Sequence, residues 1–135
     1  MNQRAMDEAC RLDADAAHIC IRVIDTLLRE DVRGCVTRAR LMSDEALAAC
    51  GDFPPGQRWL EISHMGTERV WIPVSPERFM QCWRLARLPL LAEEGGQVRA
   101  LFEVADILAR FSAGADRDTR SRFAEFEHEI GRAHV

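Results

Sequence analysis

The stretch WLEISHMGTERVWIPV (residues 59–74) decides the fold. Side chains alternate between two faces on both sides of its turn at Gly66-Thr67-Glu68, with Leu60 and Ile62 on one face before the turn and Val70, Ile72 and Val74 on one face after it. This is the pattern of two strands joined by a short loop. We therefore predict that Trp59–Met65 and Arg69–Val74 pair as an antiparallel β-hairpin. Pro73 has no amide hydrogen to donate, so its strand should be an edge there or end close by.

Upstream of this hairpin the sequence predicts a helix. Asp13 and Asp15 are placed to cap its start, and Gly34 offers a left-handed position after its end. Its apolar residues recur at helical spacing and form one broad stripe that must be buried, made of Ala16, Ile19, Cys20, Val23, Ile24, Leu27 and Leu28.

Shorter elements lie on both sides of the hairpin. Cys35–Met42 favours a strand, Ser43–Cys50 a short helical turn, and Gly51–Gly56 a break in the chain. After the hairpin, Phe79–Leu91 fits a helix or a strand, and Pro89 favours the strand because it forbids a long helix.

The C-terminal part predicts two helices. Ser75–Arg78 resembles a turn or a helix start, and Glu93-Glu94-Gly95-Gly96 is interpreted as a break. A helix is predicted from Gln97 to Phe111, and a third begins near Arg117. The stripe of the first is Val98, Leu101, Phe102, Ala105, Leu108 and Ala109. The sequence thus predicts an α+β fold: an N-terminal helix, an antiparallel meander of about three to four strands, then two helices.

Composition narrows the class of protein. The 135 residues suffice for one domain, and a net charge of −4 with a pI near 5.6 gives no basic field for nucleic acid or an anionic membrane. No signal peptide and no membrane-spanning apolar run are visible. The five cysteines are irregularly spaced, which indicates reduced thiols in a cytoplasmic protein. All 18 basic residues are Arg, a bias typical of a GC-rich genome, so a cluster of them does not by itself indicate an anion site.

Residues that could carry chemistry are few. His18 with Cys20 could ligate a metal, but Cys20 lies on the buried stripe and no second ligand pair exists, which favours a structural role. His64 is predicted to be a half-buried, hydrogen-bonded imidazole. The acidic pairs Glu93-Glu94 and Glu127 with Glu129 should lie on solvated faces. His128 and His134 receive no role.

The densest charged cluster is LLREDVRG, Leu27–Gly34. Arg29 or Arg33 could clamp a carboxylate or a phosphate, or the helix end could be tied by local ion pairs with Glu30 and Asp31. The three Trp residues of the strand region could line a pocket or serve the sheet, and they are Trp59, Trp71 and Trp83. No catalytic, cofactor-binding or metal-ligating residue is assigned.

The order of segments resembles the N-terminal region of the IucA/IucC-type siderophore synthetases, the aerobactin-like enzymes that work without a nonribosomal peptide synthetase. The resemblance rests on four segments in order. They are Leu28–Gly34 (LREDVRG) at the end of a helix, Trp71–Val74 (WIPV) in a strand, Phe79–Leu91 (FMQCWRLARLPLL), and Gln97–Glu127 as a helical segment leading to a Glu-rich helix. The resemblance covers the chain up to about His128.

This resemblance implies ATP- and Mg²⁺-dependent condensation of a citrate-type carboxylate with an amine or an alcohol, by a cytoplasmic parent enzyme that could be a homo-oligomer. The family's His-Pro-x-His-Pro-like and Ser-x-Arg-Thr-like nucleotide-binding stretches do not occur in this chain. No ATP-contacting residue is therefore carried over, and no cofactor is expected for this chain alone.

The last seven residues, EIGRAHV (Glu129–Val135), match one reading frame of a common DNA-sequencing adapter. We therefore expect residues 1–128 to be the truncated N-terminal subdomain of a synthetase and residues 129–135 to be adapter read-through. A different class of protein fits the same order of elements, namely a small acidic type III secretion-like chaperone, in which the hairpin and the Trp residues would form a groove for an unfolded partner.

Overall fold

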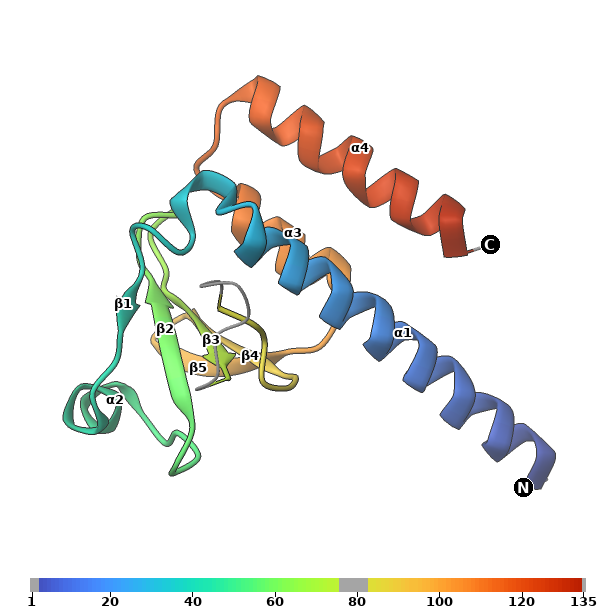
Figure 1. The fold of residues 1–135 in the computed structure, drawn as a ribbon, viewed down its shortest axis with the longest axis horizontal. Coiled ribbons are helices and arrows are strands. Elements are labelled where there is room, and N and C mark those ends of the chain that lie inside the picture. The colour runs from blue at the N-terminus through green and yellow to red at the C-terminus, as the bar shows by residue number, and fades with distance from the viewer. Residues whose placement is uncertain (1–2, 76–82, 135) are drawn as a thin grey trace.

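The computed structural model describes the backbone of residues 3–75 and 83–134, and the side chains of 14–75 and 83–130. Its strands form one antiparallel sheet in chain order, β1-β2-β3-β4-β5, and helices precede and follow it (Figure 1). The α+β prediction is confirmed, with five strands instead of three to four. The elements are α1 (Gln3–Arg29), the 3₁₀ turn η1 (Val32–Gly34), β1 (Arg40–Leu41), α2 (Asp44–Cys50), β2 (Arg58–Ile62), β3 (Val70–Val74), β4 (Leu90–Glu94), β5 (Gln97–Leu101), α3 (Val104–Ser112) and α4 (Arg117–His134).

The predicted hairpin is the centre of the sheet. β2 and β3 pair antiparallel, with Glu61 opposite Trp71 and Trp59 opposite Pro73. All five residues of β3 are buried because the sheet is covered on both faces. Pro73 lies one residue from the end of β3, beyond the two positions that pair with β4, so its missing amide hydrogen interrupts no ladder with that strand.

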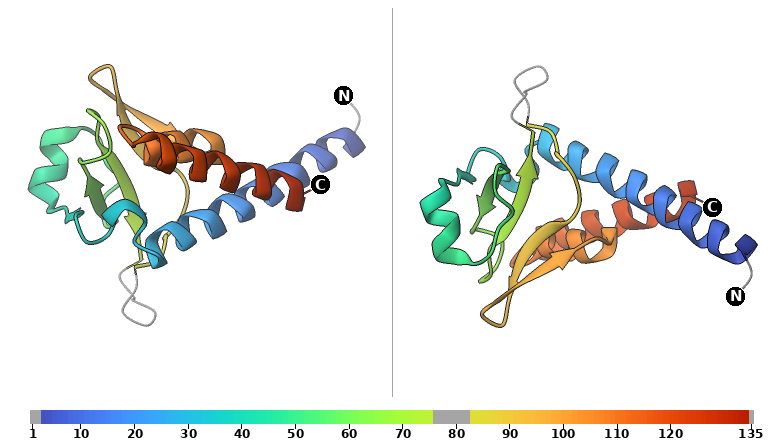
Figure 2. Two further views of the ribbon diagram at one scale, coloured as in Figure 1. Left: turned by 90° about the horizontal axis from the view of Figure 1, so that it is seen from above. Right: turned by 90° about the horizontal axis from the view of Figure 1, so that it is seen from below.

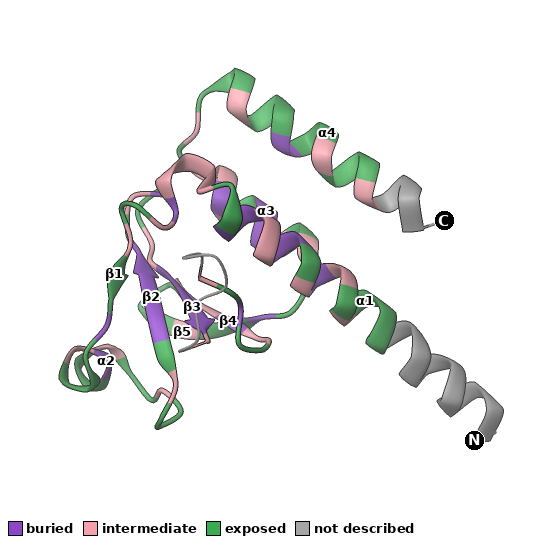
Figure 3. Cartoon of the chain, in the orientation of Figure 1, coloured by how far each residue is buried: buried purple, intermediate pink, exposed green. Residues whose placement is uncertain are grey.

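The helices cover the two faces unequally. α2 lies on one side of the sheet, whereas α1, α3 and α4 lie on the other (Figure 2). The larger core fills the space under α1 and α3, and the predicted stripe of α1 is buried in it from Cys20 to Leu28. α4 is largely exposed (Figure 3). The sheet and α3 contribute Leu60, Ile62, Val70, Ile72, Val74, Leu90, Leu101, Ile107, Leu108 and Phe111 to this core.

The face under α2 has a smaller aromatic core. The ring of Phe53 stands edge-on to both Trp59 and Trp71, with ring centroids 5.3 Å apart in each pair. Trp83 instead packs against the larger core. Two of the three tryptophans therefore stabilise the sheet, as one of the two interpretations predicted, and the three do not line a common pocket.

The first helix is longer than expected. α1 begins at Gln3, so Asp13 and Asp15 lie inside it instead of capping its start. The segment ahead of them is rich in Gln, Arg, Ala, Met, Glu and Leu, which have high helix propensity. This propensity extends the helix although the segment has no apolar stripe that would predict it. The first left-handed residue after α1 is Asp31, although Gly34 is also left-handed as predicted.

The predicted helix at 97–111 is wrong over its first half. Gly95 and Gly96 have φ values of 59° and 81°, which suits a two-residue turn between antiparallel strands. Glu93 and Glu94 therefore end β4 instead of breaking the chain, and Gln97–Leu101 returns as β5. Only the second half of the predicted segment is helical, as α3.

Two further predicted strands are shorter in the structure than expected. The strand expected at Cys35–Met42 shrinks to β1, because residues 35–38 form turns after η1. In the described part of the strand expected at Phe79–Leu91, residues 83–91, a single bridge joins Leu85 to Val74 and the strand itself begins at Leu90. Residues 76–82, with most of the predicted turn at Ser75–Arg78, lie outside the described residues. The short helix after Ser43 and the helix beginning at Arg117 are confirmed.

The described cysteines are free thiols. Burial raises the pKa of Cys20 to about 11 and that of Cys35 to about 12, so both stay protonated at neutral pH. Cys50 is half-buried and also free. The expectation of reduced thiols is met at these three positions. Across the described residues, no helix combines the length and apolarity needed to cross a bilayer.

Candidate functional site: a three-loop junction and the pocket beside it

Leu28–Gly34, the charged stretch at the end of α1, forms a tight and unusual turn. After α1 ends at Arg29, Asp31 and Arg33 both adopt left-handed backbone conformations, with φ values of 49° and 54°. This conformation costs a non-glycine residue about 1–2 kcal/mol, so side-chain contacts must hold it. Those contacts join three loops: this turn, the β2–β3 loop and the α3–α4 linker. We name this region the three-loop junction.

Asp31 holds the turn from within. Its carboxylate accepts hydrogen bonds from the amides of Val36 (2.8 Å) and Thr37 (3.0 Å), and from the Thr37 hydroxyl. These bonds to Thr37 lower the pKa of Asp31 below its ordinary value, and the nearby His64 contributes in the same direction. The carboxylate therefore stabilises the folded chain as an anion.

The pH dependence of this contribution follows from its sign. Because the folded pKa is lowered, the stabilisation by Asp31 is complete above the ordinary pKa of about 4 and is lost as the pH falls through the folded value. Asp31→Asn should lower the free energy of unfolding by about 1 kcal/mol at pH 7, and this loss should become smaller as the pH falls below about 4. Asn tolerates the left-handed conformation, so the variant isolates the charge.

Urea unfolding followed by circular dichroism at several pH values measures this difference. Asp52→Asn, in an exposed loop, is the matched control. It should cause only a small change in the free energy of unfolding, and that change should not depend on pH. A loss that is the same at pH 3 and pH 7 in Asp31→Asn would contradict the assigned role of the charge.

Arg33 connects the turn to α3. Its Nη1 donates to the backbone carbonyls of Phe111 and Ala113, each at 2.8 Å. The last carbonyls of a helix have no partner within the helix, so the guanidinium caps the C-terminal end of α3. The predicted anion clamp at Arg33 thus binds carbonyl oxygens. Of the predicted local ion pairs, the described side chains show only Arg29 with Glu30, at 3.5 Å and exposed.

His64 completes the junction. Its Nε2 lies 2.7 Å from the carbonyl oxygen of Arg33, so Nε2 carries the proton and donates it. The imidazole is half-buried and hydrogen-bonded, as predicted. Two residues along, Gly66 lies so close to Ala113 that a Cβ on Gly66 would come within 3.1 Å of the alanine Cβ. The β2–β3 loop and the α3–α4 linker are therefore in direct contact.

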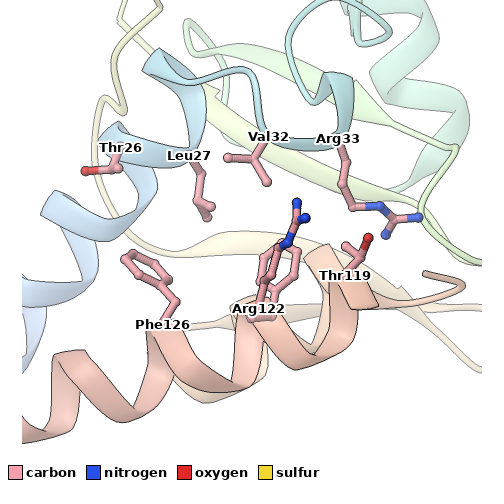
Figure 4. A pocket seen from close by; sticks show the side chains of 8 residues that line it. Thr26, Leu27, Val32, Arg33, Thr119, Arg122 and Phe126 are labelled. Carbon is pink, nitrogen blue, oxygen red and sulfur yellow. The ribbon is translucent and has the colours of Figure 1, made fainter. Parts of the chain in front are cut away.

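A pocket of about 350 Å³ opens beside this junction, between the end of α1 and α4. Figure 4 shows side chains from α1, η1 and α4 converging on it. Its floor is apolar, and two hydroxyls and two guanidinium groups lie at its margin. We name it the α1–α4 pocket, and its lining is Thr26, Leu27, Val32, Arg33, Thr119, Arg122, Phe123 and Phe126.

The lining of this pocket carries an excess of positive charge. No carboxylate lines it, and the side chain of Arg122 makes no hydrogen bond to the described residues and no ion pair with them within 4 Å. The nearest acidic influence is Asp116, whose Oδ1 accepts from the Thr119 amide at 2.7 Å. That bond is the main cause of its lowered pKa, and Arg122 and Arg33 add weaker attraction. Two guanidinium groups thus face one carboxylate that already caps α4.

A second polar cluster lies on the α2 face of the sheet. Glu61 is only 8% exposed and accepts a hydrogen bond from Trp71 Nε1 at 3.0 Å. Arg40 and Arg69 lie within 3.7 Å of its oxygens, and Arg69 also pairs with Glu93 at 3.1 Å. These charges form a ladder across the sheet from β1 to β4, which is a structural arrangement with every member paired.

Several predicted assignments are settled by this geometry. Glu94 is exposed, as predicted, and pairs with Arg99 and Arg110, whereas Glu93 is half-buried and pairs with Arg69, so the prediction of a solvated pair is wrong for Glu93. His18 is exposed whereas Cys20 is fully buried, so they do not share a site. No three His, Cys, Asp or Glu side chains are grouped for a metal ion within the described part of the chain. The remaining positions are exposed and lie on α4, namely Glu127, His128 and Glu129, while the side chain of His134 is not described.

Sequence reasoning missed the pocket residues on α4. A signal was present, since Thr119, Arg122 and Phe126 recur at intervals of three and four and so share one helix face. The partner face on α1 and η1 had no such signal, because Thr26 received no assignment and Val32 was considered only as part of the charged stretch Leu27–Gly34.

The fold and the pocket thus define an α+β domain with an antiparallel meander between two unequal helical layers. Comparison with known proteins gives no match: no family model, no curated protein and no solved structure is significantly similar to this chain.

Proposed function

We propose that this chain is the N-terminal portion of a cytoplasmic, ATP-dependent siderophore synthetase of the IucA/IucC type. The observation that carries the proposal is the arrangement of the segments that resemble this family. Leu28–Gly34 forms one wall of the α1–α4 pocket, and α4, which contains the end of the Gln97–Glu127 segment, forms the other. Trp71–Val74 lies in the central strand between the two cores. Segments that are distant in sequence therefore build one structural unit.

In this proposal the chain supplies a scaffold for the parent enzyme. That enzyme uses Mg²⁺ and ATP to activate a citrate-type carboxylate, which an amine or an alcohol then captures. Every charged side chain of the charge ladder is paired, and the junction is held by internal hydrogen bonds from Asp31, Arg33 and His64, which suits a structural role. Leu41 and Phe102 are 47% and 59% exposed, and we assign them contacts with other parts of the parent. Nucleic acid and membrane are not expected partners.

The alternative is the type III secretion-like chaperone. The helix–meander–helix order favours it, but its expected groove does not fit, because Trp59 and Trp71 are 3% and 0% exposed beneath α2 and Phe53. A chaperone of this class would be a discrete dimer. Light scattering that shows a stable dimer of the chain would favour this alternative.

The genomic DNA downstream of codon 128 tests the proposal most directly. We expect an open reading frame that continues in the same frame and encodes a His-Pro-x-His-Pro-like stretch shortly afterwards. A genomic stop codon at or soon after this position, in two independent clones, would refute the assignment to a synthetase.

Nucleotide binding offers a biochemical test. Because Mg-ATP requires phosphate donors and metal ligands held together, and the chain has no lysine, we expect titration calorimetry with Mg-ATP and citrate to show no saturable binding. The same titration of a longer protein that includes the downstream stretch should give a saturable isotherm. A micromolar isotherm with the present chain alone would contradict the proposal.

A further inference from the structure

We propose that the α1–α4 pocket binds a monocarboxylate with a short aliphatic chain, and that Arg122 holds the carboxylate. This inference is independent of the proposed function, because it rests only on the lining of the pocket. The pocket combines an apolar floor with a guanidinium that has no partner among the described residues. An amphipathic anion complements both features at once.

The apolar part of the ligand would lie against α1 and α4. Leu27 is 3% exposed and Phe123 is 8% exposed, and both belong to the larger core, so the floor of the pocket is continuous with that core. Phe126 is half-buried and projects from α4 toward the end of α1 (Figure 4). An alkyl chain inserted there would remove apolar surface from water on three sides.

The charged end of the ligand is fixed by the two arginines. Arg122 extends from α4 into the gap between α4 and η1 (Figure 4). Nη1 of Arg33 donates to the carbonyls of both Phe111 and Ala113. Nη2 and Nε of Arg33 have no hydrogen-bond partner among the described residues. A carboxylate beside Arg122 would accept charge-assisted bonds from its guanidinium, which are the stronger kind, and the positive charge of Arg33 would add attraction.

The same geometry excludes more highly charged ligands. Citrate would place additional carboxylates against Phe123 and Phe126, where no donor compensates their loss of hydration. Asp116, which already caps α4 beside the pocket, adds repulsion for each further negative charge. One carboxylate on an aliphatic chain is therefore the chemistry that fits.

Octanoate is the probe for this site. Titration of the ¹⁵N-labelled chain, followed by amide chemical shifts, should show saturable changes at Thr26, Val32, Thr119 and Phe126, with a Kd between tens of micromolar and roughly millimolar. Octan-1-ol has the same chain without the charge and should bind at least tenfold more weakly. Citrate should leave these four amides unshifted.

Two matched variants locate the anion contact. Arg122→Gln should weaken octanoate binding at least tenfold, whereas Arg120→Gln, on an exposed part of the same helix outside the pocket, should change it less than twofold. Both positions are exposed, so circular dichroism should show an unchanged fold. The proposal is overturned by any of three results: no saturable shift up to about 10 mM octanoate, equal binding of octan-1-ol, or equal weakening by both variants.

Discussion

Phe111→Ala should reduce the free energy of unfolding by about 3–5 kcal/mol, as expected for the truncation of a fully buried aromatic side chain. The phenyl ring is fully buried in the larger core at the end of α3. Removing it deletes apolar contacts and leaves a cavity that the surrounding strands cannot close. The backbone carbonyl of the same residue accepts from Arg33, so relaxation of the helix end would also loosen the three-loop junction.

Phe102→Ala is the matched control, because it removes the same side chain only nine residues away. Phe102 is 59% exposed between β5 and α3, so its truncation should change stability by no more than about 0.5 kcal/mol. Urea denaturation of both variants measures the contrast. In a continuous helix over 97–111, Phe102 would belong to the buried stripe, and a loss of several kcal/mol in both variants would support that arrangement against the observed strand.

This pair of variants also marks where sequence reasoning succeeded and where it failed. The spacing of Leu101 and Leu108 suits one helix face, and both residues are buried, but they reach the core from different elements. The predicted burial of these two residues was therefore correct, but the single helix from which it was inferred was wrong. The Gly95-Gly96 pair was recognised as a break, but the same pair was the available sign of a hairpin, because glycine readily adopts the left-handed conformation that a two-residue turn requires.

The hairpin at 59–74 and the stripe of α1 were predicted correctly because their signals are local. Two strand-like runs on both sides of a short loop, and apolar residues at helical spacing from Cys20 to Leu28, each specify a structure without any partner segment. The covering of both faces of β3 was not predictable in this way. It depends on α2 and Phe53, which pack against Trp59 and Trp71 through contacts that leave no period in the sequence.

The candidate site lay beyond sequence reasoning for a related reason. Arg33 and Phe111 are 78 positions apart, and nothing near either residue indicates the other. The charged stretch was correctly identified as dense in contacts, but its main partners are backbone carbonyls, which every residue has. Local ion pairs were the natural interpretation, and of these only the exposed pair of Arg29 and Glu30 formed among the described side chains.

The charge ladder on the α2 face leads to the second large expected effect. Glu61→Ala should destabilise the chain by about 2–3 kcal/mol, because it leaves the buried indole N–H of Trp71 without an acceptor. The ion pairs of Glu61 with Arg40 and Arg69 add little, since the two arginine side chains are 65% and 35% exposed. Most of the loss therefore comes from one hydrogen bond within the aromatic core.

Glu61→Gln separates the hydrogen bond from the charge. The amide oxygen of Gln can still accept from Trp71 Nε1, so this variant should lose only about 1 kcal/mol. In a Trp71→Phe background, which removes the donor, Glu61→Ala should have a clearly smaller effect than in the native chain, with a coupling energy of about 1 kcal/mol or more. Because the bond is shielded beneath Phe53 and α2, this coupling should persist in 1 M salt. A coupling that disappears at high salt would instead assign the stabilisation to the exposed arginines.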